Sequence, residues 1–305
     1  MPTHNGTVLV TGGTGRQGGA TARALLAADV PVRALVRDPR SKSARAVEAL
    51  GAQLVRADLS DPASLGPAVE GVHAVFSVQM PPMTETSVDF AGELAQAANL
   101  MDAAKAAGVR HFVQSSTSGV GAHTRAPGWA DGRWAALEGY FDTKQAILEA
   151  VRTAGFPRWT VLKPAFFMEN LPQLAPNGPR GGLLTVLRPD TELALVATQD
   201  IGSAAAHAIG SPDRFHEVEL ELAGDLLTMA RIARTLSAAW GVPVTVPSMS
   251  LDDALAAGMP RWGAGHDWNN EVLQPARPEF ARALGISPTT FADWAHEHLS
   301  PVSHS

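Results

Sequence analysis

Residues 7–18 read TVLVTGGTGRQG, a short apolar run followed by a glycine-rich turn. Gly12, Gly15 and Gly18 have the spacing G-x-x-G-x-x-G. The first glycine of such a turn permits a tight bend, the second lets the backbone approach a pyrophosphate, and the third lets the next helix pack closely on the strand. The amides at the start of that helix face the phosphates. The stretch therefore predicts a dinucleotide-binding turn, lined by Thr14, Arg16 and Gln17.

Short apolar runs alternate with alanine-rich stretches through the first half of the chain. We expect strands at 7–11, 32–36, 53–57, 74–78, 111–114 and 160–162, and helices at 17–28, 41–50, 62–70, 89–107 and 137–153. This alternation predicts right-handed crossovers and a parallel sheet with helices on both faces. The predicted fold class is therefore α/β, a Rossmann-type doubly wound sheet that binds its ligand at the carboxyl ends of the strands.

The alternation weakens after Pro164. Residues 170–182 are predicted as a loop leaving the main domain, and 193–209 and 218–223 as a return to its sheet and flanking helix. Further helices are expected near 228–239, 251–256 and 289–296. The predicted division is a Rossmann domain over 1–164 with return segments at about 193–223, a smaller C-terminal α/β cap domain over 165–192 and 224–300, and a disordered tail at 301–305.

The composition excludes several functions. The 305 residues carry 24 Lys and Arg against 30 Asp and Glu, and the formal charge of -6 argues against nucleic acid as a direct partner. The absence of cysteine excludes a thiol nucleophile and a disulfide scaffold. His296 and His298 diverge on a helix and form no zinc motif, so no metal is expected. With neither an apolar membrane span nor a signal peptide, we expect a cytoplasmic protein. The sequence is compatible both with a monomer and with a homo-oligomer.

The end of the second predicted strand distinguishes between the two nicotinamide coenzymes. Arg37 stands where an NAD site would place Asp or Glu for the ribose 2′-hydroxyl. A guanidinium suits a 2′-phosphate instead, and Lys42 follows shortly. Asp38 is the counter-argument, although a side chain one position further on points elsewhere. The pattern favours NADP(H), against the alternative that these are ordinary surface cations.

Several motifs together resemble a known family. They are residues 11–18 (TGGTGRQG), 36–39 (VRDP), 57–59 (ADL), 161–171 (VLKPAFFMENL), 199–202 (QDIG) and 287–294 (SPTTFADW). On these motifs the chain resembles the NmrA-like family, an atypical branch of the short-chain dehydrogenase/reductase superfamily. The resemblance implies a Rossmann domain, a small C-terminal domain and a substrate cleft between them. The family includes NADPH-dependent reductases and also non-catalytic regulators, so membership alone does not settle function.

The resemblance also implies positions for the coenzyme. Asp58 and Leu59 would lie near the adenine, and Lys144 would hold the nicotinamide ribose. The dinucleotide backbone would run along Val78, Gln79 and Met80, and the nicotinamide would lie beside Pro164, Phe166 and Phe167.

Tyr140 and Lys144 form the superfamily's Y-x-x-x-K signature, and Tyr140 is the only tyrosine of the chain. The i, i+4 spacing places both on one helix face, where an ammonium stabilises a phenolate and lets the phenol exchange its proton with a substrate oxygen. Ser116 or Thr117, after the fifth strand, is the candidate for a carbonyl-orienting hydroxyl; spacing does not choose between them. The helix asparagine of many catalytic relatives is not identified in this sequence, because the middle of 89–107 offers Glu93 and Gln96 instead.

Four tryptophans and the 166–168 segment are candidates for the wall of an apolar or aromatic substrate pocket; the alternative is that they pack an interdomain seam. The tryptophans are Trp129, Trp134, Trp262 and Trp268.

The leading hypothesis is an NADPH-dependent reductase that transfers hydride to a carbonyl, quinone-like or conjugated small molecule. The alternatives are a non-catalytic NADP(H) sensor, and an isomerase, epimerase or cyclase on the same scaffold.

Overall fold

The strand β1 (Thr7–Val10) lies inside a seven-stranded sheet of order β3-β2-β1-β4-β5-β6-β9. The computed structural model describes residues 6–84 and 87–302. β1 pairs in parallel with β2 (Val32–Val36) on one side and with β4 (Val72–Ser77) on the other. The parallel pairing continues to β3 (Gln53–Arg56), and through β5 (His111–Ser115) to β6 (Arg158–Pro164). The chain order reverses between β1 and β4, which creates a switch point there. The predicted α/β fold class is confirmed.

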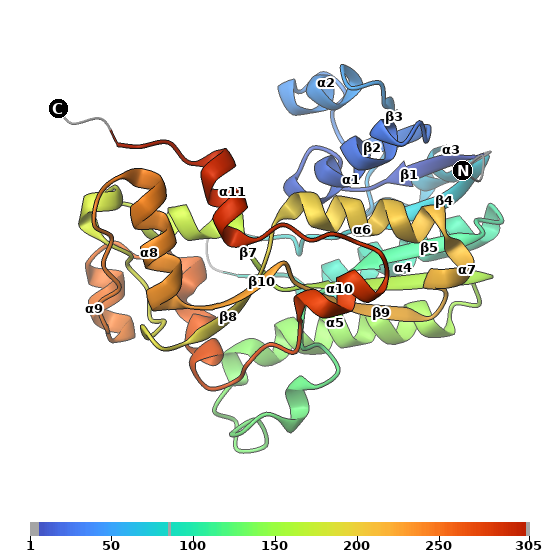
Figure 1. The fold of residues 1–305 in the computed structure, drawn as a ribbon. Coiled ribbons are helices and arrows are strands. Elements are labelled where there is room, and N and C mark those ends of the chain that lie inside the picture. The colour runs from blue at the N-terminus through green and yellow to red at the C-terminus, as the bar shows by residue number, and fades with distance from the viewer. Residues whose placement is uncertain (1–5, 85–86, 303–305) are drawn as a thin grey trace. The chain divides into compact units, whose positions relative to one another are not determined.

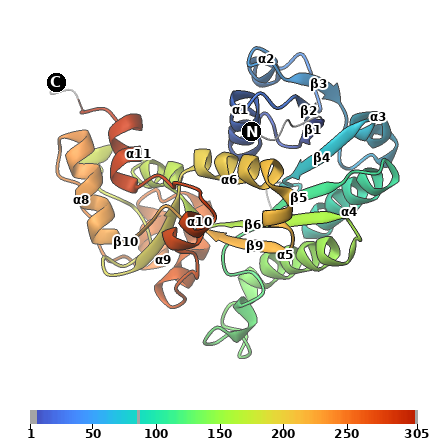
Figure 2. The same cartoon turned by 45° about the vertical axis from the view of Figure 1, so that its right-hand side comes forward.

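Helices cover both faces of this sheet (Figures 1 and 2). One face carries α1 (Arg16–Ala27) and α6 (Thr198–Gly210); the other carries α3 (Leu65–Val69), α4 (Phe90–Ala106) and α5 (Ala135–Thr153). The core on the second face joins Leu100 of α4 and Leu148 of α5 to the strand residues Val75 and Phe112, all buried. Consecutive residues of β1 and β5 are buried because helices cover both faces of the sheet, which explains why these strands lack alternation.

A close contact between α1 and α6 explains the QDIG segment. A Cβ placed on Gly202 of α6 would collide with the backbone of Ala20 on α1. Only glycine allows the two helices to approach so closely at this point.

Local signals set the helix starts. Asp89 caps α4, since its side chain accepts a hydrogen bond from the Gly92 amide at 2.8 Å. Ser41 caps α2 (Lys42–Glu48) by accepting from the Ala44 amide at 3.2 Å. The helix expected at 62–70 starts as a 3-10 turn, Pro62–Ser64, before α3 begins. The sheet ends at β9 (Val218–Leu222), which follows the short α7 (Pro212–Phe215).

The chain divides into two compact units that interleave along the sequence. Unit 1 comprises residues 1–120, 138–163 and 198–220, and unit 2 comprises 121–137, 164–197 and 221–305. Unit 2 has its own sheet of order β10-β8-β7. In it β8 (Glu192–Val196) pairs antiparallel with β10 (Asp225–Thr228) and parallel with β7 (Phe166–Phe167). The helices of this unit are α8 (Met229–Trp240), α9 (Leu251–Ala256), α10 (Pro278–Ala283) and α11 (Phe291–His298).

Unit 2 departs from two expectations. The strand expected at 193 to return to the main sheet is β8 of the small sheet, because its partners β7 and β10 lie outside the main one. The loop expected at 170–182 contains 3-10 segments, Met168–Leu174 and Pro179–Gly181, and Met168, Leu171 and Leu174 of the first are buried. Two further 3-10 segments are His123–Arg125 and Arg261–Asn270. Residues 303–305 of the expected tail lie outside the described residues.

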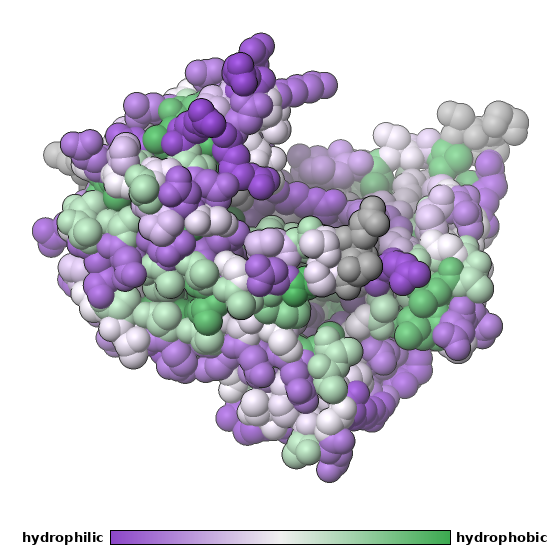
Figure 3. Space-filling model, turned by 180° about the vertical axis from the view of Figure 1, so that it is seen from behind, coloured by the Kyte–Doolittle hydropathy of each residue, from purple (hydrophilic) through white to green (hydrophobic). Residues whose placement is uncertain are grey.

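The surface seen in Figure 3 mixes hydrophilic and hydrophobic residues, and its hydrophobic atoms form small groups. Among the exposed apolar side chains are Met80 and Met83, which follow β4. Within the described residues, no helix combines the length and the apolar character needed to cross a membrane.

Candidate functional site

The glycine turn after β1 is packed tightly against the loop after β4. The Thr11 hydroxyl donates to the Val78 carbonyl at 3.0 Å and accepts from the Val78 amide at 2.8 Å. Gly12 has φ +61, and a Cβ there would lie 2.8 Å from a methyl group of Val78. A Cβ on Gly18 would collide with the backbone of Thr11 and Gly12. At Gly12 and Gly18 the turn therefore has no side chain between its backbone and its neighbours, and it lies at the switch point between β1 and β4.

Amide and hydroxyl side chains tie the neighbouring strand ends together. Ser115 donates to the Gln17 Oε1 at 2.6 Å, which links the end of β5 to the first turn of α1. Gln114 donates to the Gln79 Oε1 at 3.0 Å, and Gln79 in turn donates to the Ser77 hydroxyl at 2.6 Å. Gln79 is only 3% exposed, so its side chain supports the strand ends from within. Met80, the next residue, is 71% exposed.

The basic side chains expected to bind the coenzyme phosphates lie at the surface. Arg37, directly after β2, is exposed and makes no hydrogen bond or ion pair with any described residue. Asp38 is engaged locally instead, because its carboxylate accepts from the Arg40 amide at 2.9 Å and lies 3.7 Å from the Arg40 Nε. Arg16 and Lys42 are exposed as well. The carboxylate that would argue for NAD is thus held by its neighbour, while the Arg37 guanidinium remains available.

The turn after β3 is built by side chains that bond its backbone. The Asp58 amide donates to the Ser64 hydroxyl at 3.0 Å, and the Asp58 carboxylate accepts from the Ser60 amide at 2.9 Å. Asn99 of α4 donates to the Leu59 carbonyl at 2.9 Å. These bonds fix both residues that the resemblance places near the adenine.

Tyr140 and Lys144 lie on one face of α5, as their spacing predicts. The Lys144 ammonium is 5.8 Å from the centre of the Tyr140 ring. Tyr140 is half-buried, and its hydroxyl makes no hydrogen bond with any described residue. The Lys144 ammonium lies 2.5 Å from the Glu93 Oε1 on α4. The sequence analysis noted Glu93 only as a departure from asparagine. In the structure Glu93 is the charged residue on the buried face of α4, whose other buried residues are apolar.

The candidate hydroxyls follow β5 directly. Ser116 donates its amide to the Leu162 carbonyl at 2.8 Å, and its hydroxyl is buried without a partner among the described residues. Thr117 is half-buried. Neither side chain bonds Tyr140 in the part of the chain that the structure describes.

A buried ion pair that the sequence analysis did not single out closes the edge of the main sheet. The Lys163 ammonium lies 2.6 Å from the Glu219 Oε2 and donates to the Val120 carbonyl at 3.1 Å. Arg152 donates through Nε to the other carboxylate oxygen at 2.6 Å. Burial acts to raise the pKa of Glu219, but the hydrogen bonds and charges of Lys163 and Arg152 outweigh it and hold the pKa below its usual value. Lys163 belongs to the motif VLKPAFFMENL, and its ion pair joins β6 to β9.

Unit 2 gathers most of the candidate pocket aromatics. Trp268 lies edge-on to Trp129 and Trp134, with ring centres 5.7 and 5.0 Å apart. His266 lies edge-on to Phe166 at 5.1 Å and to Trp262 at 5.3 Å. Burial lowers the pKa of His266 to about 4, so its imidazole is neutral at physiological pH. Trp134 and Trp268 are buried and pack this unit, whereas Trp262 is exposed.

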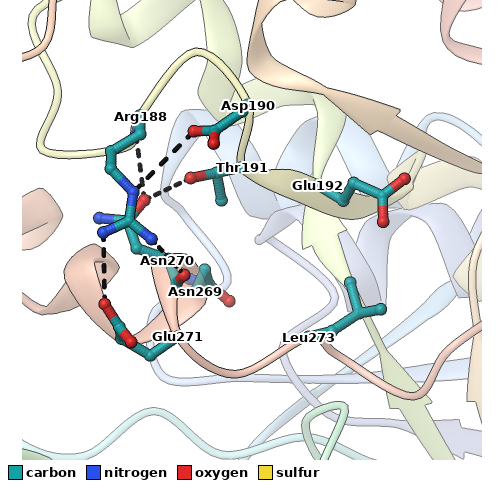
Figure 4. Close-up of a pocket in the computed structure, with 8 residues that line it drawn as sticks. All are labelled: Arg188, Asp190, Thr191, Glu192, Asn269, Asn270, Glu271 and Leu273. Atoms are coloured by element: carbon teal, nitrogen blue, oxygen red, sulfur yellow. Dashed lines mark hydrogen bonds and ion pairs between the residues drawn. The ribbon is translucent and has the colours of Figure 1, made fainter.

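A polar pocket of about 200 Å³, open to solvent, also lies in unit 2 (Figure 4). Its polar groups are already engaged with one another. Asn270 accepts from the Arg188 amide at 3.0 Å and from the Thr191 hydroxyl, and Arg188 lies 3.2 Å from Glu271. No residue expected from the sequence to bind coenzyme or substrate lines it. Among the described residues there is no group of three or more potential ligands placed to hold a metal ion.

The residues that the resemblance places beside the nicotinamide all belong to unit 2. Pro164 ends β6, and Phe166 and Phe167 form β7 of unit 2. All other predicted coenzyme and catalytic residues belong to unit 1.

A parallel sheet with a glycine turn at its switch point defines the chain as a Rossmann-like α/β protein. The chain belongs to the NmrA-like family, whose model matches residues 4–260. An NAD(P)H azoreductase of Xenophilus azovorans is 32% identical over 305 residues, which cover 96% of this chain and 98% of the relative.

Solved structures agree with this placement. The structure of the NADPH-dependent quinone oxidoreductase of Escherichia coli complexed with NADPH has a TM-score of 0.75 at 25% identity, covering 95% of this chain and 99% of that one. Citrobacter sp. triphenylmethane reductase complexed with NADP(H) has a TM-score of 0.76, covering 96% of this chain and 100% of that one. At 21% identity, the second likeness concerns the fold alone.

Proposed function

We propose that the protein is an NADPH-dependent reductase that transfers a hydride to a small aromatic or quinone-like acceptor. The observation that carries the proposal is the pair on α5: the ammonium of Lys144 lies 5.8 Å from the ring of Tyr140. This pair belongs to the same compact unit as the glycine turn. The names of the azoreductase and quinone oxidoreductase relatives support the reaction class.

The turn fits a dinucleotide on two grounds. Gly12 and Gly15 are exposed, so the backbone of the turn is open to a ligand. Gly18 lacks the side chain that would force the turn open, which keeps the first amides of α1 close to it. The exposed Arg37 guanidinium after β2 supports the choice of NADPH, because a guanidinium is well suited to bind a ribose 2′-phosphate.

The chain's residues have distinct roles in the proposed reaction. Bound NADPH supplies the hydride. Lys144 donates hydrogen bonds to the nicotinamide ribose. Tyr140 would give the proton of its hydroxyl to the acceptor oxygen or nitrogen, so that one hydride from the coenzyme and one proton from Tyr140 together add two electrons and two protons to the acceptor, and Tyr140 would then regain its proton from solvent. Ser116 or Thr117 orients the acceptor by a hydrogen bond.

The aromatic side chains of unit 2 support the choice of acceptor. Phe166 and Trp262 flank a neutral His266, and Trp262 is exposed. Flat aromatic acceptors are bound well by such edge and face contacts.

The direct test follows NADPH absorbance with a benzoquinone, an azo dye and an aromatic aldehyde as acceptors. Consumption of NADPH with at least one of them is expected. NADPH binding without consumption by any acceptor would favour the non-catalytic sensor, and conversion of a substrate without net NADPH consumption would favour an isomerase, epimerase or cyclase.

A further inference from the structure

Glu93 is the most deeply buried carboxylate near the α5 pair. It is 0% exposed, and the Lys144 side chain is 12% exposed. One carboxylate oxygen accepts from the Lys144 ammonium at 2.5 Å, and the other is buried without a hydrogen-bond partner among the described residues. Glu93 therefore loses hydration on both carboxylate oxygens and gains one strong contact. This burial costs free energy, which favours a role for Glu93 other than stabilising the fold.

A close approach of α4 and α5 brings the two groups together. A Cβ on Gly139 of α5 would lie 2.8 Å from the ring of Phe90 on α4. Glu93 follows Phe90 by one helical turn, and Lys144 follows Gly139 by little more than one. The small residue at 139 thus sets the spacing at which the carboxylate reaches the ammonium.

The ion pair does not use all the hydrogen-bond donors of the Lys144 ammonium. An ammonium has three donors, and Glu93 accepts one of them. Lys144 makes no other hydrogen bond with the described residues, and part of its side chain remains exposed. The ammonium is therefore fixed from the α4 side with donors left for a ligand.

A buried ion pair is weak evidence for a role in stability, since a well-packed apolar pair can replace it at little or no cost. A lysine on a long, flexible stem, by contrast, loses much rotamer freedom when it must hold one position. An anchor that fixes the ammonium before a ligand arrives removes that cost from binding.

We propose that Glu93 is a positioning residue: it anchors the Lys144 ammonium for the nicotinamide-ribose half of the coenzyme. The inference rests on the proposed function for the role of Lys144 at the ribose. Glu93 itself does not take part in the hydride or proton transfer. Glu93 lies in the helix on which many relatives carry an asparagine, and it acts through Lys144.

The test is a double-mutant cycle on the full chain, read by calorimetric titration. The four proteins are wild type, Glu93→Gln, Lys144→Met and the double variant. Each is titrated with NADPH and with adenosine 2′,5′-bisphosphate, which lacks the nicotinamide ribose. The ratio of the two affinities removes any long-range effect of charge on the phosphates and any general damage to the fold. Glu149→Gln, an exposed charge on α5 that pairs with Arg152, is the matched control.

We expect Glu93→Gln to lower the preference for NADPH over the fragment about tenfold, the loss of one charge-assisted contact. The control keeps the wild-type ratio. In the Lys144→Met background, Glu93→Gln has no further effect on the ratio. Glu93→Asp keeps the charge but withdraws the carboxylate by one methylene, and it too lowers the ratio.

An unchanged ratio in both Glu93 variants, or an equal loss with and without Lys144, would overturn the proposal. If the Glu93 variants lose affinity for the fragment and for NADPH to the same extent, the role of Glu93 is merely structural, and the proposal is overturned as well. The proposed function fails separately: wild-type protein would then bind the fragment and NADPH equally well, or it would bind NADPH without consuming it when any of the acceptors is added.

Discussion

The ammonium of Lys144 lies 5.8 Å from the centre of the Tyr140 ring, while the same ammonium is 2.5 Å from the carboxylate of Glu93. One cation thus links the first turns of α4 to the middle of α5, next to the only tyrosine of the chain. The Tyr140 hydroxyl has no hydrogen-bond partner among the described residues, so it can donate a hydrogen bond to a ligand.

Replacing Tyr140 by Phe removes that proton and keeps the ring. We expect NADPH affinity within about twofold of wild type, because the ring and Lys144 remain, and turnover lower by about a hundredfold or more, the usual contribution of a general acid. Steady-state NADPH oxidation and calorimetry measure the two quantities. Unchanged turnover would reject Tyr140 as the acid.

Arg37 and Arg40 offer a matched pair for coenzyme choice. Both are exposed, but only Arg40 is paired with Asp38. Arg37→Ala is expected to weaken NADPH binding about tenfold or more and to leave NADH binding unchanged, because only NADPH carries the 2′-phosphate. Arg40→Ala should change neither. Equal losses for both coenzymes in Arg37→Ala would refute the assignment of its guanidinium to the 2′-phosphate.

Gly18→Ala tests the turn itself. Its Cβ would collide with the backbone of Thr11 and Gly12, so the turn must open and α1 must move away from it. We predict a loss of NADPH affinity of at least about tenfold and a lower melting temperature. Gly66→Ala on α3, where no atom lies within 4 Å, is the control and should match or exceed wild-type stability. Wild-type affinity in Gly18→Ala would contradict the tight packing described here.

Two buried histidines predict an acid-sensitive fold. Burial, with the nearby charges of His73, His216 and Arg158, lowers the pKa of His111 to about 4, and burial alone lowers the pKa of His266 to about 4. Unfolded chains bind these protons below their ordinary pKa of 6.5, so stability is complete above that pH and falls as the pH drops from 6.5 toward 4. His111 accounts for at most about 3 kcal/mol of this fall.

Urea unfolding at pH 7, 6 and 5 checks this dependence. Glu219 contributes in the same direction but only below its ordinary pKa of 4.5, because its pKa is lowered in the folded protein. His266→Phe keeps an aromatic ring between Phe166 and Trp262 and should reduce the loss measured at pH 5. A free energy of unfolding that is constant over this range would argue against neutral buried imidazoles.

Most of the main sheet could be predicted because its signals are local. The run TVLV, the glycine spacing and the β-branched strand at 32–36 each carry their structure within a few residues. Capping residues such as Ser41 and Asp89 mark helix starts in the same way.

The small sheet could not be predicted, because its strands owe their existence to distant partners. Phe166 pairs with Leu195, and Leu226 with Ala194, and β7 is only 2 residues long. No periodicity is readable in so short a strand. The same limit hid the Glu93–Lys144 contact, which joins residues 51 positions apart, and the Lys163–Glu219 pair between β6 and β9. Charge pairs of this kind leave no pattern in a single sequence, whereas the spacing from Tyr140 to Lys144 along one helix does.

Calorimetric titration of the wild-type protein with NADPH and with NADH tests most directly whether the glycine turn binds a dinucleotide. Saturable binding of NADPH at one site per chain, at least tenfold tighter than NADH, is the expected result. No heat with either coenzyme from folded protein would contradict the assignment of the glycine turn to a dinucleotide.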